Sequence, residues 1–107
     1  MSVWEAREAA FEKGLEIDFA LRFKSLARRN KLLGLWVAEK LGLSGSDSEV
    51  YALRLVEDEV GHDDDAALAA KIDAALSGVS PPISAHRIRR RIAEMTAIAA
   101  QQVFEGR

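Results

Sequence analysis

The sequence contains no cysteine, only two prolines, and no apolar run as long as a membrane span. The lack of cysteine excludes a disulfide framework, thiol catalysis and thiolate metal sites, and it is compatible with a reducing compartment. The missing long apolar stretch argues against a secretory signal and against a membrane-spanning helix. We therefore expect a cytoplasmic protein that does not insert into the membrane.

Motifs of enzyme chemistry are also missing. There is no phosphate-cradling glycine loop and no nucleophile elbow, and no nucleophile or orienting carboxylate is tied by sequence to His86. His62 is followed by three aspartates, but adjacent residues do not converge on one ion without a loop geometry such as the calcium-binding pattern, which is absent. We predict no catalytic residue, no metal site and no enzyme activity.

What the chain does contain indicates a small all-α domain. Its 107 residues are enough for one domain with a real core, and 49% of them are hydrophobic, with alanine and leucine dominating. Strict alternation of apolar and polar residues, which is typical of strands, is missing. The net charge of −2 is too small to indicate nucleic acid or a membrane surface as the partner.

One long helix ending at Gly42 is predicted as the spine of this domain, with Gly42 in the left-handed position after its last turn. Its apolar positions recur at spacings of three and four and form one stripe: Phe19, Phe23, Leu26, Leu33, Val37 and Leu41. Asn30 falls within the stripe, where it either fixes the register of packing or sits at its edge. Lys24, Arg28, Arg29 and Lys31 are expected to form a basic ridge away from the stripe.

Three further helices follow after short turns. The second is predicted to begin at the capping-box pattern of Ser46 to Glu49, the third at Asp63 or Asp64, and the fourth at Ser84. Their expected core positions are Val50, Leu53 and Val60, with Tyr51, Leu55 and Val56 nearby; Leu68, Ile72, Ala75 and Leu76; and Ile88, Ile92, Met95, Ala99 and Val103. Such helices bury their apolar sides only by packing together, so we predict a four-helix bundle over residues 19–107.

Charge is distributed unevenly over these helices. Residues 57–65 hold an acidic corner, whereas Arg87 to Arg91 crowd the first turns of the fourth helix, where positive charge opposes the helix dipole. We expect the acidic corner to compensate for these arginines. In the alternative reading, the Arg28/Arg29 cluster and the Arg87–Arg91 cluster form one basic pocket for a nucleotide or a nucleic acid.

The first 18 residues differ from the rest of the chain. Trp4, Phe11 and Leu15 give them a narrow apolar side among alternating charges, and Gly14 weakens the helix. Such a segment either covers one end of the core or folds when it is laid into a groove on another protein. We predict that residues 1–18 form a mobile amphipathic arm, separate from the bundle.

The sequence also resembles a known family. The matching residues are Phe11-Glu12-Lys13, Phe23-Lys24, the run from Ala27 to Ala38, Leu41-Gly42 and Tyr51-Ala52, with a looser match at His86–Arg90. In these residues the chain is similar to the zeta subunit family of alphaproteobacterial ATP synthases, and the run ARRNKLLG is its most specific part.

This resemblance implies a protein that inhibits ATP hydrolysis by ATP synthase by inserting its N-terminal helix into the catalytic head, between the alpha and beta subunits and against the gamma subunit. It implies that Phe11, Glu12 and Lys13, with the preceding Trp4, belong to the inhibitory arm. We expect Trp4, Phe11 and Leu15 to be the apolar anchors of this arm, and Glu12 and Lys13 to orient it through charged contacts. No cofactor is required, but ADP or ATP is implied as a regulatory ligand, with candidate residues Lys24, Arg28, Arg29, Asn30 and Arg90. We expect a monomer when free, found at the inner face of the cell membrane when bound to the enzyme, and no nucleic-acid partner.

Two other hypotheses are compatible with the sequence. The first is the basic-pocket module described above, for which titration with ADP, ATP and a short RNA at moderate salt is the test. The second is a purely structural adaptor, which would bind the ATP synthase without changing its hydrolysis rate.

Overall fold

A computed structural model describes residues 3–107 of the chain, and it describes side chains from Phe19 onward. Over these residues the protein consists of four helices and no strand, which confirms the predicted all-α class. The helices are α1 (Val3–Lys40), α2 (Gly45–Asp58), α3 (Asp65–Ala75) and α4 (Ala85–Phe104).

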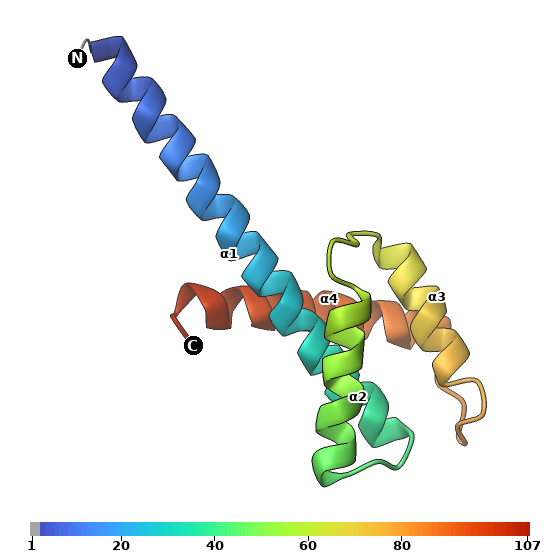
Figure 1. Ribbon diagram of the computed structural model, residues 1–107. Helices are drawn as coiled ribbons and strands as arrows, with labels where there is room; N and C mark the ends of the chain where they lie inside the picture. The colour runs from blue at the N-terminus through green and yellow to red at the C-terminus, as the bar shows by residue number, and fades with distance from the viewer. Residues whose placement is uncertain (1–2) are drawn as a thin grey trace.

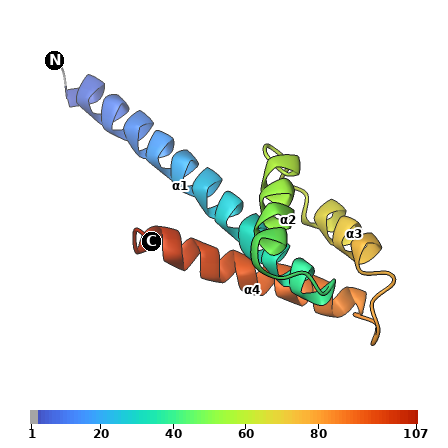
Figure 2. The same cartoon turned by 60° about the horizontal axis from the view of Figure 1, so that its bottom comes forward.

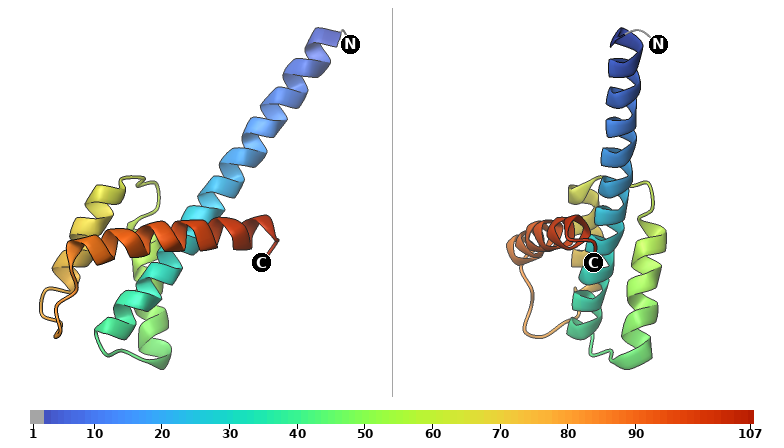
Figure 3. Two further views of the ribbon diagram at one scale, coloured as in Figure 1. Left: turned by 180° about the vertical axis from the view of Figure 1, so that it is seen from behind. Right: turned by 90° about the vertical axis from the view of Figure 1, so that its left-hand side faces the viewer.

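The helix α1 is the spine of the molecule, as predicted. Its C-terminal half lies between α2 on one side and α4 on the other, and α3 packs against α4 (Figure 3). The helix α2 returns alongside α1, whereas α4 crosses α1 obliquely beneath it (Figure 2). The N-terminal half of α1 projects beyond the other three helices, and the molecule is therefore 64 Å long but only 27 and 21 Å across (Figure 1).

The end of α1 is built as the sequence predicts. Gly42 has a φ of +81°, its N–H donates to the carbonyl of Glu39, and the N–H of Leu43 donates to the carbonyl of Ala38 at 2.9 Å. These two bonds define a Schellman motif, in which the left-handed residue favours glycine. The motif stops α1 and turns the chain towards α2.

The starts of α3 and α4 are also confirmed. The carboxylate of Asp64 accepts hydrogen bonds from the N–H groups of Ala66 and Ala67, and the hydroxyl of Ser84 accepts from the N–H of Arg87.

The predicted start of α2 is wrong by two residues. The N-cap is Ser44, without a side-chain capping bond, rather than Ser46. Positive φ angles at Gly42 and Gly45 reverse the chain so sharply that the helix begins before the capping-box pattern.

One hydrophobic core joins the four helices. Its buried members are Leu33, Trp36 and Val37 of α1, Leu55 of α2, Leu68 and Ile72 of α3 with Leu76 directly after it, and Ile88 and Ile92 of α4. All the expected core positions of α4 are buried or half-buried, and in α3 only Ala75 is exposed against expectation. The period of the apolar residues therefore predicted the core faces of α3 and α4.

The predicted stripe of α1 is correct only in its middle part. Leu33 and Val37 are buried and Leu26 is half-buried, but Phe19 and Phe23 are 73% and 51% exposed, and Leu41 at the other end is also exposed. The end of α2 and the loop after it line a hollow beside Phe19 and Phe23 without covering them.

The predicted apolar side of α2 is only partly correct. Leu55 is buried and Tyr51 and Val56 are half-buried, but Val50 and Leu53 are more than half exposed, as is Val60 after the helix. Ala52, which was not predicted, is buried. The cause is a close approach of α2 to α1 at Gly34, where an added Cβ would lie 2.6 Å from the Cα of Ala52. Because α2 turns its small residue Ala52 towards α1, Val50 and Leu53 face solvent.

Candidate partner-binding surface

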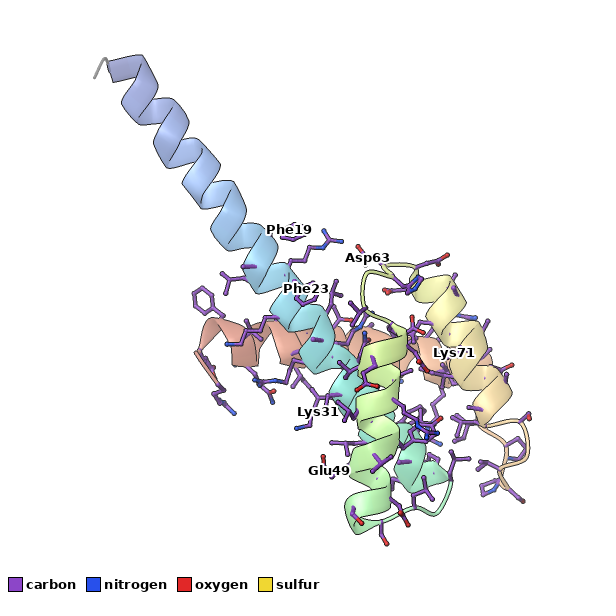
Figure 4. The ribbon with its side chains drawn as sticks, in the orientation of Figure 1. Phe19, Phe23, Lys31, Glu49, Asp63 and Lys71 are labelled. Carbon is purple, nitrogen blue, oxygen red and sulfur yellow. The ribbon has the colours of Figure 1, made fainter. Side chains whose placement is uncertain are left out.

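A hollow of about 190 Å³ lies where the projecting part of α1 meets the body of the protein. We call it the arm-base hollow. It is lined by Phe19, Phe23 and Leu26 of α1 and by Val56, Val60 and the loop that carries Asp63, and its wall is mostly apolar. Figure 4 shows Phe19 and Phe23 on successive turns of α1, on the side that faces this loop. Two exposed aromatic side chains at the base of a projecting helix form a surface suited to binding another protein.

A second, larger hollow of about 500 Å³ runs between α1 and α2, and we call it the α1–α2 groove. Its residues are Lys24, Ala27, Arg28 and Lys31 of α1 and Glu49, Val50, Leu53 and Val56 of α2. The positive charges therefore lie along the α1 wall, whereas the α2 wall is mostly aliphatic, with one carboxylate at Glu49. Ala27 and Val56 line both hollows, so the two are continuous along α1.

Arg29 was predicted to be part of the exposed basic ridge, but the structure places it in the interior. Its side chain is only 4% exposed, and its guanidinium donates to Asp65 at 2.9 Å and, through Nε, to the amide oxygen of Asn30 at 3.1 Å. Asn30 is also buried. One guanidinium therefore fixes the first turn of α3 to α1 and satisfies the polar residue that interrupts the apolar stripe.

We predict that Arg29→Lys lowers the free energy of unfolding by about 1–3 kcal/mol, because a single ammonium group cannot reproduce the two divergent hydrogen bonds of the guanidinium. Urea denaturation would measure the loss. The matched control is Arg22→Lys, because Arg22 pairs with Asp63 at the surface and such pairs contribute about 0–1 kcal/mol. Equal losses in the two variants would contradict a structural role for Arg29.

The two arginine clusters do not form one pocket. The guanidinium of Arg28 donates to Gln102 and to the carbonyl of Arg107, at the C-terminal end of α4. Arg90 pairs with Glu94 near the other end of α4, about three turns and roughly 18 Å away from Gln102. The basic-pocket alternative required the clusters to meet, and the structure keeps them apart.

The expected compensation of the arginines on α4 by the acidic corner is also wrong. Both Arg90 and Arg91 pair with Glu94 of their own helix, and Arg91 also lies 5.3 Å from the ring centroid of Trp36. The indole N–H of Trp36 is buried and has no hydrogen-bond partner among the described residues. The stacked guanidinium therefore covers a core tryptophan.

The aspartates of the acidic corner have separate structural roles. Asp63 pairs with Arg22, Asp64 caps α3, and Asp65 pairs with Arg29. From Phe19 to Arg107, no three histidine or carboxylate side chains are grouped closely enough to hold a metal ion. The acidic corner thus attaches the start of α3 to α1.

A small ion cluster connects the end of α2 to α3. Lys71 donates to Glu59 at 3.0 Å and lies near Asp58, and the hydrogen bond to Glu59 raises the pKa of Lys71. Burial raises the pKa of Tyr51, against a smaller opposing effect of Lys71. Both groups therefore keep their usual protonation states at neutral pH.

The predicted site residues fall into four groups. Trp4, Phe11, Glu12, Lys13 and Leu15 lie outside the described side chains, although the backbone at these positions is part of α1. Of the five predicted nucleotide-binding residues, Lys24 and Arg28 line the α1–α2 groove, Arg29 and Asn30 are buried beside each other, and Arg90 lies on a distant part of α4. The structure therefore does not assemble these five residues into one site.

Two parts of this surface were not predicted from the sequence, the arm-base hollow and the aliphatic wall of the α1–α2 groove. Five of their residues were expected in the core, because their spacing matches that of core residues: Phe19, Phe23, Val50, Leu53 and Val60. Only the neighbouring helices decide which of them is covered.

The fold and the surface together define a small helical protein with a firm body, a projecting helix and exposed surfaces suited to binding other proteins. The model of the family described as ATPase inhibitor subunit zeta matches residues 1–102, and the chain belongs to this family. Comparison with curated proteins and with solved structures gives no further match. None of the helices described here is long and apolar enough to cross a membrane.

Proposed function

We propose that this protein inhibits ATP hydrolysis by ATP synthase, with the N-terminal part of α1 inserted into the catalytic head between the alpha and beta subunits and against the gamma subunit. Membership of an ATPase inhibitor family supports the target. The observation that carries the mechanism is the projection of α1 beyond its own bundle (Figure 1). A helix without neighbours of its own can enter a space between subunits that move against each other.

The sequence of the projecting helix supports an apolar mode of binding. Phe11, Leu15, Phe19 and Phe23 follow one another at intervals of four residues, which places them along one ridge of a helix. The last two are exposed at the arm-base hollow. The ridge would therefore continue from the predicted arm onto the body, and a partner that accepts the arm would also cover these two phenylalanines.

The test is removal of residues 1–18, followed by an assay of ATP hydrolysis by the cognate ATP synthase head. We expect the truncated chain not to inhibit ATP hydrolysis. The full chain should inhibit it in proportion to the fraction of heads to which it is bound. A second variant, Phe11→Ala with Leu15→Ala in the full chain, should raise the half-inhibitory concentration at least about tenfold, because buried aromatic and aliphatic anchors dominate such interfaces.

The control for the double variant is Ala6→Gln with Ala9→Gln, which changes the opposite side of the same helix. It should inhibit nearly as well as the natural sequence. Thermal melting of each variant would show that the bundle is intact, since the core lies between Leu33 and Ile92. Undiminished inhibition by the truncated chain would overturn the mechanism.

Binding of ADP or ATP as a regulatory ligand stays a prediction. If a nucleotide binds, only Lys24 and Arg28 of the five predicted residues share a surface that its phosphates could reach. The guanidinium of Arg29 already donates hydrogen bonds to the amide oxygen of Asn30 and to the carboxylate of Asp65.

A further inference from the structure

The α1–α2 groove combines two features that the fold itself does not use. Lys24 and Lys31 are exposed, and neither forms an ion pair with any side chain from Phe19 to Arg107. Opposite them, the side chains of Val50 and Leu53 are 55% and 57% exposed on consecutive turns of α2. Unneutralised positive charge beside uncovered aliphatic surface is typical of an interface that is completed by another molecule.

The spacing of these residues indicates the shape of the missing molecule. Lys24 and Lys31 stand at positions i and i+7 and therefore lie in one row along α1, on the order of 10 Å long. Arg28 lies between them, but its guanidinium donates to Gln102 and to the carbonyl of Arg107, so the two lysines carry the free charge of the row. Val50 and Leu53, at i and i+3, form a parallel row on α2. Figure 4 shows Lys31 and Glu49 on the two helices that wall the groove. A helix of about two turns, with aliphatic side chains on one side and carboxylates beside them, would match both rows.

We propose that the α1–α2 groove docks an acidic amphipathic helix on the surface of the ATP synthase head. This inference rests on the proposed function and adds to it a second contact, distinct from the arm. The partner follows from continuity, because Lys24 comes six residues after the predicted end of the arm, about 9 Å further along the same helix. Insertion of the arm into the head would bring the groove against the outer surface of the head.

The two contacts would have different consequences for inhibition. The arm obstructs rotation, so it determines how much hydrolysis remains at saturation. The groove holds the body on the head, so it determines how much protein is needed for saturation. Electrostatic attraction across the groove would also accelerate association and would weaken as salt screens it.

The test compares three forms of the full chain, the natural sequence, Lys24→Glu with Lys31→Glu, and a control with the same change in net charge, Arg87→Glu with Arg89→Glu. Both control residues are exposed on α4, away from the groove. Binding to the purified head is measured by a direct method at about 50 and 200 mM salt, and the residual rate of ATP hydrolysis is measured at saturation.

We expect the groove variant to bind at least about tenfold more weakly at low salt, to lose most of the salt dependence, and still to inhibit fully at saturation. The control should bind as the natural sequence does. Val50→Ser with Leu53→Ser should also weaken binding, but without changing its salt dependence, because the removed surface is apolar. The melting temperature of this variant should be nearly unchanged, because Val50 and Leu53 are already exposed in the natural protein.

Equal affinity of the groove variant and the control would overturn the proposal. So would a groove variant that loses only binding of ADP or ATP, since the groove would then be a nucleotide site. If the chain binds the head but no form inhibits hydrolysis, the proposed function fails, while the affinities still decide whether the groove is a docking surface.

Discussion

Leu33→Ala is expected to lower the free energy of unfolding by about 2–5 kcal/mol, one of the largest losses that a single truncation can cause in this protein. The side chain of Leu33 is completely buried, and it lies in the core that joins α1 to the other helices. Removing three carbon atoms there loses the free energy gained by their transfer out of water, and it leaves a cavity between rigid helices. Urea denaturation, analysed for its midpoint and slope, would measure the loss.

The matched control is Leu53→Ala, the same chemical change at a leucine of α2 that is mostly exposed. It should cost less than about 0.5 kcal/mol, because little apolar surface returns to water. If the two substitutions had similar effects, Leu53 would be covered in solution, and the α1–α2 groove would not be available to a partner.

Local signals predicted the ends of three helices correctly. Gly42 closes α1, and Asp64 and Ser84 open α3 and α4, because each is satisfied by backbone groups within a few residues along the chain. Such bonds depend little on the rest of the fold. The start of α2 was misplaced because the two flanking glycines, rather than the Ser46–Glu49 pattern, determine where the chain turns.

The faces of α1 and α2 could not be predicted in the same way. Periodicity identifies residues that can be buried, but it does not say whether neighbouring elements cover them. Phe19 and Phe23 continue the stripe of Leu33 and Val37, yet the end of α2 and the loop after it only line a hollow beside them and leave both largely exposed. The projecting part of α1 is therefore a consequence of tertiary arrangement, although the sequence predicted a separate arm.

The residues that most strongly indicate the family have structural roles here. Within the run ARRNKLLG, Arg29 pairs with Asp65, Asn30 accepts from Arg29, Leu33 fills the core, and Gly34 admits α2. Of this run, Ala27, Arg28 and Lys31 line the α1–α2 groove. A specific motif thus identified the family without identifying the binding surface, because burial of a charged residue such as Arg29 is invisible until its partner on α3 is placed.

Gly34→Ala is expected to destabilise the protein by about 1–3 kcal/mol or more, although alanine is the better helix former by about 1 kcal/mol. The added Cβ would lie 2.6 Å from the Cα of Ala52 and 3.1 Å from its Cβ. Backbone atoms cannot rotate away as a flexible side chain can, so α2 would have to move off α1 along its whole contact. The loss of packing would then exceed the gain in helix propensity.

Gly78→Ala is the control, because nothing lies within 4 Å of the position that its Cβ would take. Thermal melting should show it within about 0.5 kcal/mol of the natural sequence. Shifting α2 would also reshape the α1–α2 groove, which α2 walls with Val50 and Leu53. Gly34→Ala should therefore lower affinity for the ATP synthase head even under conditions where the variant is fully folded. A Gly34→Ala variant as stable as the natural protein would mean that α2 does not approach α1 as closely as described.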